Sequence, residues 1–186
     1  MVRFGIMDLT RVALSALELL VTIGMAVLVV YVTMRALIRA NTDFDEDKEI
    51  ARGNVSVGLL VAALLLASAN IMHNAFTPAA DAVRAHFSGP AGGATHAQVL
   101  LYAIGNLALG FVVVVATLSF SLRLFGRLTR SEKTRPGKEL ERGNLAVGIL
   151  LSCVVLIVSM FVGGGVQALS KALIPAPRTA RIQIMR

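Results

Sequence analysis

Four long apolar runs constrain the fold of this chain more than any other feature of its sequence. They extend from about Val12 to Met34, from Val55 to Met72, from about Val99 to Leu122 and from Leu145 to Val162. A helix needs about 20 apolar residues to cross a bilayer. Backbone amides in hydrocarbon must be paired within their own segment, so each run is expected to be a helix. The sequence therefore predicts an all-α polytopic membrane protein with four transmembrane helices.

The composition agrees with a membrane environment. Apolar residues make up 56 % of the chain and charged residues only 16 %, whereas soluble domains are roughly 45–50 % apolar. We expect the lipid bilayer to cover the excess apolar surface. The net charge of +7 does not indicate a nucleic-acid partner, because the basic residues lie beside the apolar runs and no aromatic platform accompanies them.

No motif for catalysis or cofactor binding occurs in the sequence. Gly163-Gly164-Gly165 lacks the downstream Lys-Ser/Thr of a phosphate loop, and we expect this glycine run to loosen or end the fourth helix. The lone Cys153 lies in an apolar run, and the three histidines are scattered around the segment between the second and third runs. We therefore expect no enzyme activity, no cofactor and no metal site.

The distribution of lysine and arginine predicts the topology. Of the 18 basic residues, four follow the first run and seven follow the third, whereas Arg84 alone lies between the second and third runs. The positive-inside rule then places both hairpin loops in the cytoplasm and both termini on the opposite side. The basic C-terminal tail, residues 178–186, argues for the other orientation.

A near-identical string occurs twice in the chain. Residues 48–60 read KEIARGNVSVGLL and residues 138–150 read KELERGNLAVGIL, with eight of thirteen positions identical at an offset of 90. The Arg-x-x-x-Arg pattern before each string also recurs, at an offset of 88. We predict two tandem helical hairpins, residues 10–88 and 97–177, related by a pseudo-twofold axis along the membrane normal. The first hairpin is expected to end in a short interfacial helix that starts at Thr77-Pro78 and covers residues 79–87.

This duplicated pair of two-helix units, with a K-E-x-x-R-G-N-x-x-x-G entry to the second helix of each, resembles the YjfL-like inner-membrane proteins. The resemblance covers roughly residues 10 to 165. It implies a duplicated domain of unknown function in the bacterial inner membrane. In that membrane, the orientation given by the positive-inside rule places the termini in the periplasm. It brings no assigned catalytic residues.

The repeated charges are expected at the lipid headgroups. Glu49 and Arg52 are three residues apart, as are Glu139 and Arg142, so each pair can meet on one helix face. We expect the second and fourth helices to start before these pairs and to run through them into the bilayer. The arginines would then anchor the helices at the interface. The alternative is a gate or a docking site for a partner.

The repeated small and amide residues are expected to pack the second and fourth helices together. Glycine allows close approach of helix backbones, and an amide can donate a hydrogen bond across such a contact. The predicted packing residues are Gly53, Gly58, Gly143 and Gly148, and the predicted bonding amides are Asn54 and Asn144. The alternative is that these residues form a polar constriction of a pore.

Glu18 is an acid inside the first apolar run, and its counterpart at an offset of 88 is Asn106. An ionised carboxylate facing lipid is costly, so Glu18 is expected to face protein or water or to be protonated, with Asn70 or Ser68 as a candidate partner. One interpretation is a group that handles protons or cations. The other is a buried hydrogen-bonded contact between helices, or a residue at the outer membrane interface if the span sits lower in the bilayer.

Two functions from different classes follow. The first is a structural or accessory membrane protein that forms a homo-oligomer or joins a larger membrane complex. The alternative is a small oligomeric ion channel or transporter lined by Glu18 and the repeated asparagines.

Overall fold

The computed structural model describes residues 5–40, 45–88, 95–128 and 136–173. In these ranges the regular structure is helical. The long helices are α1 (Gly5–Ala40), α3 (Val55–Ser88), α4 (His96–Leu128) and α6 (Leu145–Leu173). The short helices α2 (Glu46–Ala51) and α5 (Pro136–Glu141) precede α3 and α6. The four long helices are each long and apolar enough to cross a membrane, as the sequence predicted.

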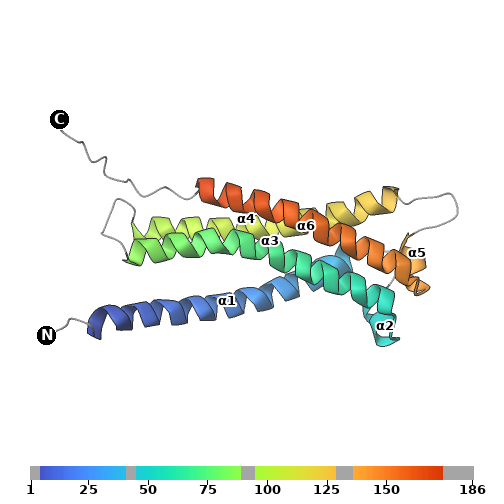
Figure 1. The fold of residues 1–186 in the computed structure, drawn as a ribbon, viewed down its shortest axis with the longest axis horizontal. Helices are drawn as coiled ribbons and strands as arrows, with labels where there is room; N and C mark the ends of the chain where they lie inside the picture. The colour runs from blue at the N-terminus through green and yellow to red at the C-terminus, as the bar shows by residue number, and fades with distance from the viewer. Residues whose placement is uncertain (1–4, 41–44, 89–94, 129–135, 174–186) are drawn as a thin grey trace.

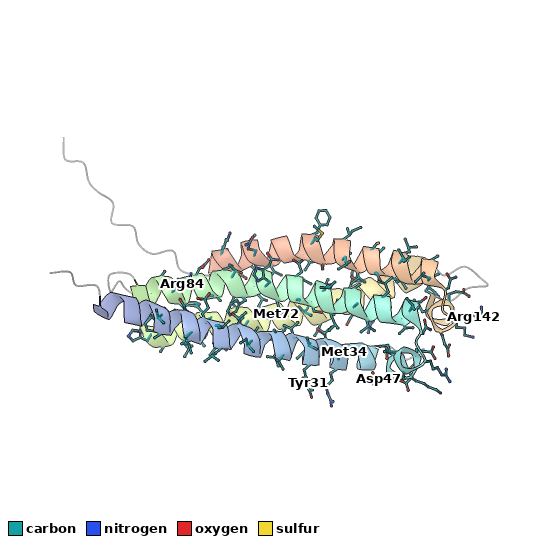
Figure 2. All side chains as sticks on the ribbon, turned by 60° about the horizontal axis from the view of Figure 1, so that its bottom comes forward. Tyr31, Met34, Asp47, Met72, Arg84 and Arg142 are labelled. Carbon is teal, nitrogen blue, oxygen red and sulfur yellow. The ribbon has the colours of Figure 1, made fainter. Side chains whose placement is uncertain are left out.

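The helices form an elongated bundle in which the long helices alternate in direction (Figure 1). Both short helices lie at one end, where α1 and α4 finish and α3 and α6 begin. Figure 2 shows the same polarity, with Arg84 near one end and Asp47 and Arg142 near the other. The short helices α2 and α5, which belong to the segments predicted to be cytoplasmic, therefore lie at a common end of the bundle.

The helix α3 is the centre of the bundle. It packs most extensively against α6, next against α4, and less against α1. Of the residues in the most apolar stretch of α3, 56 % are buried, compared with 11 % for α1. Leu64, Ala67 and Ile71 are almost completely buried in the middle of α3. The first helix is thus the least covered of the four.

Two predicted helix boundaries were wrong. Residues 79–87 do not form a separate interfacial helix, because α3 continues through Pro78 to Ser88. Membrane helices tolerate proline in their interior. Next to Pro78, the Thr77 hydroxyl donates to the His73 carbonyl at 2.9 Å. Similarly, α6 continues through the glycine run 163–165 to Leu173.

A capping box explains where α4 begins. The backbone N–H of Gln98 donates to Oγ1 of Thr95 at 3.3 Å, and the backbone N–H of Thr95 donates to Oε1 of Gln98 at 2.9 Å. This reciprocal pair satisfies donors that the first turn of a helix leaves free.

The predicted tail, residues 178–186, lies outside the described residues, as does the end of the second predicted unit.

Candidate functional site

A turn between α2 and α3 joins three residues of the repeated string. Glu49 accepts hydrogen bonds from Nη1 of Arg52 at 2.8 Å and from Nδ2 of Asn54 at 3.0 Å. Between them Gly53 has a φ of 79°, a conformation that glycine adopts without steric cost. Asn54 then caps α3, because its Oδ1 accepts from the backbone N–H of Ser56 at 3.1 Å.

The turn between α5 and α6 has the same construction. Glu139 accepts from Nη1 of Arg142 at 2.8 Å and from Nδ2 of Asn144 at 3.1 Å. Gly143 has a φ of 78°. The prediction that Gly53, Asn54, Gly143 and Asn144 lie inside helices was therefore wrong, because in both copies the left-handed glycine ends the short helix and the asparagine starts the long one.

The first turn differs from the second in one contact. Nδ2 of Asn54 also donates to the carbonyl oxygens of Leu140 at 2.8 Å and Glu141 at 3.2 Å, at the end of α5. The predicted bond of Asn54 across a helix contact is thus present, and it joins the start of α3 to α5. In the described residues the amide of Asn144 bonds only within its own turn. The two turns are therefore adjacent but not interchangeable.

Both turns hold their glutamates in the ionised form. The hydrogen bond from Asn54, followed by the contact with Arg52, lowers the pKa of Glu49 below its ordinary value. For Glu139 the hydrogen bond from Asn144 is again the largest cause, followed by Arg142, and the pKa is also lowered. The two arginines have exposed side chains, so each keeps donors free beyond its glutamate.

The contact between α3 and α6 is close at glycine positions. A Cβ atom on Gly148 would lie 2.9 Å from the Ser56 carbonyl oxygen, and one on Gly163 would lie 2.9 Å from Nδ2 of Asn74 and 3.0 Å from Nδ2 of Asn70. Asn70 also donates to the Ser159 carbonyl at 3.0 Å. The predicted packing role therefore applies to Gly148. It does not apply to Gly58, beside which no side chain or neighbouring helix lies within 4 Å.

The polar residues between α3 and α6, Asn70 and Asn74, form the first part of a polar seam along α3. The seam continues between α3 and α4. Nδ2 of Asn106 donates to the Ala75 carbonyl at 2.8 Å, and Asn106 is 4 % exposed. A Cβ atom on Gly110 would lie 2.8 Å from that of Ala75. Sequence reasoning singled out Asn106 but missed Gly110 and Asn74, which have no counterpart of the same type in the other half. The available signal was the spacing: Gly110 follows Asn106 by four residues, and Asn74 follows Asn70 by four residues, so each pair shares one helix face.

Glu18 has a different partner from those predicted. Its carboxylate forms an ion pair with the Arg84 guanidinium of α3, whereas Asn70 bonds α6 and the Ser68 hydroxyl bonds the Leu64 carbonyl of its own helix. The Glu18 side chain is 32 % exposed. The ion pair joins α1 to α3 near the end of the bundle remote from the two turns (Figure 2).

Two histidines meet at that same end. Nε2 of His86, in the last turn of α3, lies 2.8 Å from Nδ1 of His96, the first residue of α4, and the Phe87 ring stacks on His96. His73 lies elsewhere on α3. In the part of the chain that the structure describes, three or more histidine, cysteine or acidic side chains do not gather in a group that could hold a metal ion.

The described residues form an all-helical bundle whose four long apolar helices indicate a multi-pass membrane protein. Residues 10–166 match the family model Domain of Unknown Function (DUF350), and the chain belongs to this family. No curated protein and no solved structure matches the chain.

Proposed function

We propose that this protein is a structural or accessory subunit of the bacterial inner membrane that acts as a homo-oligomer. One observation supports the structural role: Asn54, Asn70 and Asn106 donate to main-chain carbonyls of neighbouring helices within the chain. These groups hold helices together, because satisfying a polar group on a neighbouring helix is one way to associate helices in lipid. The Nδ2 groups of these asparagines are therefore engaged in contacts within the bundle.

The channel alternative has less support. It relies on Glu18 as a group that handles ions in the membrane, and the carboxylate of Glu18 is instead paired with Arg84. Intramembrane charges commonly pair in this way when they stabilise a helix contact. The pairing favours a role for Glu18 in positioning α1 against α3.

We propose further that the two hairpins descend from one duplicated unit, with both short helices on the cytoplasmic side and Gly5 and Leu173 toward the periplasm. The matched turns support the duplication, because eight of thirteen residues are identical and the two glycines share a φ near 80°. The twofold relation expected from the sequence lacks such support. Ser56 meets Gly148, whereas Gly58, the counterpart of Gly148, has no such neighbour.

The proposal is tested by measuring the mass of the purified protein in lipid nanodiscs, together with ion flux in proteoliposomes. We expect an assembly of several chains and no flux above that of empty vesicles. A monomer at all protein concentrations would refute the oligomeric function. A flux abolished by Glu18→Gln, with assembly unchanged, would establish the channel instead.

A further inference from the structure

The internal contact between α3 and α6 joins two different faces of the repeated helix. On α3 this contact includes Ser56, Asn70 and Asn74, and on α6 it includes Gly148, Ser159 and Gly163. At the offset of 90, the first set corresponds to Ala146, Met160 and Gly164, and the second set to Gly58, Ala69 and His73. The two sets of contact residues therefore share no equivalent positions.

The described residues of this chain do not cover the counterpart residues on α6. Ala146 and Gly164 are exposed, and Met160 is 70 % exposed. A Cβ atom on Gly164 would meet no side chain and no neighbouring helix within 4 Å. On α3, one face binds α6. The described residues leave the corresponding face of α6 uncovered.

The described residues leave the counterpart residues on α3 uncovered as well. Ala69 and His73 are exposed, Gly58 is partly exposed, and a Cβ atom on Gly58 would meet no side chain and no neighbouring helix within 4 Å. On α3 and on α6 alike, the face that corresponds to the partner helix's contact face is therefore uncovered by the described residues. A contact between two different faces does not close on itself, and it can be repeated by further copies to give a ring or a row.

We infer that α6 of one chain packs on α3 of a second copy and continues the internal α3–α6 interface from chain to chain. In this contact Ala146, Met160 and Gly164 of one chain lie against Gly58, Ala69 and His73 of the next. The helices run parallel, as α3 and α6 do within the chain. This inference rests on the proposed oligomeric function and assigns the surface by which the copies meet.

The sparse burial of α1 has the same explanation. α4 packs extensively on α3, where Asn106 and Gly110 lie against Ala75. The counterpart of α4 is α1, whose apolar stretch is 11 % buried, compared with 17 % for α4. The counterpart of Ala75 is Gly165, which is exposed and has open space beside it. When α6 of one chain packs on α3 of the next, α1 of that next chain covers Gly165 of the first.

The native Cys153 provides a direct test. It is exposed on α6 and corresponds to Ala63 of α3, which lies two turns from both Ser56 and Asn70 on the internal contact face. The residue expected opposite Cys153 in the next chain is Ala62, the counterpart of the buried Ser152. Ala62→Cys should therefore form an intermolecular disulfide with Cys153 on oxidation in membranes, because two cysteines bridge when their Cβ atoms are about 4 Å apart.

Two controls accompany this experiment. Phe120→Cys places a second thiol on an exposed position of α4, 62 % exposed, at a similar distance from the same end of the bundle. The unmodified chain carries Cys153 alone. We expect a ladder of cross-linked species with Ala62→Cys, whose last step gives the number of chains in a ring, and only uncross-linked chain with Phe120→Cys or with Cys153 alone.

The experiment distinguishes failure of the assigned surface from failure of the proposed oligomeric function. If the protein is an oligomer in nanodiscs but neither Ala62→Cys nor Leu65→Cys, one turn further on, cross-links to Cys153, the assigned surface is wrong and the oligomeric function stands. If Cys153 alone cross-links, the copies meet by a symmetric α6–α6 contact and the inference is overturned. A monomer would refute both proposals.

A glycine pair gives a second readout that does not depend on oxidation. Gly164→Leu adds a side chain to the free face of α6, and Gly105→Leu adds the same side chain to an exposed glycine of α4 that also has open space beside it. We expect Gly164→Leu to shift the nanodisc population at least about tenfold toward monomer, a change of about 1.4 kcal/mol, and Gly105→Leu to leave it unchanged. Equal behaviour of the two variants would overturn the assigned surface.

Discussion

Gly148 of α6 lies against the backbone of Ser56 at the start of α3, where a Cβ atom would be 2.9 Å from the Ser56 carbonyl oxygen. Backbone at this distance cannot move away as the end of a flexible side chain can. We therefore predict that Gly148→Leu lowers the yield of folded subunit and destabilises it by about 1–3 kcal/mol or more, the range for overpacking in a well-packed interior. The midpoint of unfolding in an SDS titration measures this effect.

Gly58→Leu is the matched control, because Gly58 occupies the equivalent position in the other half of the chain but has open space beside it. Its unfolding midpoint should stay close to that of the unmodified protein, while its assembly in nanodiscs weakens. Equal destabilisation by the two leucines would contradict the α3–α6 packing described above.

A second prediction separates the two repeated asparagines. Asn54 and Asn144 both cap a long helix and bond a glutamate, but Asn54 alone also bonds the carbonyls of Leu140 and Glu141. Asn144→Ala should cost about 1 kcal/mol, as the loss of a helix cap does. Asn54→Ala should cost more, by up to about 1.7 kcal/mol for the added contact between helices.

Paired SDS titrations of the two alanine variants measure the difference, and the double variant shows whether the two losses are independent. Equal losses would mean that the bonds of Asn54 to α5 contribute nothing to stability.

The four spans could be predicted from the sequence because the length of an apolar run is a local property. The turns at Gly53 and Gly143 were missed because a glycine before an apolar run was read as a packing residue. The Gly-Asn order contained the correct signal, since glycine ends helices and asparagine begins them. The continuation of α3 through Pro78 was missed because proline was read as a helix start.

The partners of the polar side chains were harder to predict. Glu18 and Arg84 are 66 positions apart, and Asn106 meets Ala75 rather than another polar side chain. Such pairs depend on the rotation and depth of each helix against its neighbour, which apolar periodicity does not fix. His86 and His96 are ten positions apart, and they meet because one lies at the end of α3 and the other at the start of α4.

A third prediction concerns acid. The pKa values of Glu49 and Glu139 are lowered in the folded protein by their asparagines and arginines. A lowered folded-state pKa means that these carboxylates stabilise the fold above their ordinary pKa of 4.5, and that this stabilisation is lost as the pH falls through the lower folded-state values. Stability should therefore decrease with acidification below about pH 4.5.

Thermal unfolding in detergent between about pH 3 and pH 7 measures this loss. The variant Glu49→Gln/Glu139→Gln should show a smaller decrease in the acid range, because it lacks both titrating groups. An acid profile identical to that of the unmodified chain would assign the loss to other carboxylates.

The last prediction tests the ion pair between α1 and α3. Glu18→Gln leaves Arg84 without its partner, and Arg84→Gln leaves Glu18 unpaired within an apolar span. The second change should be more harmful, because an unpaired carboxylate inside a span is costly. Removing both charges should recover part of the loss, so the SDS midpoints should give a coupling energy of about 1 kcal/mol in a double-mutant cycle.

Proteoliposome flux measured on the same variants should stay at the level of empty vesicles, since a carboxylate engaged in holding α1 against α3 is not available to carry ions. Additive losses would show that Glu18 and Arg84 do not act as a pair, and would reopen the interpretation of Glu18 as a group exposed to an ion path.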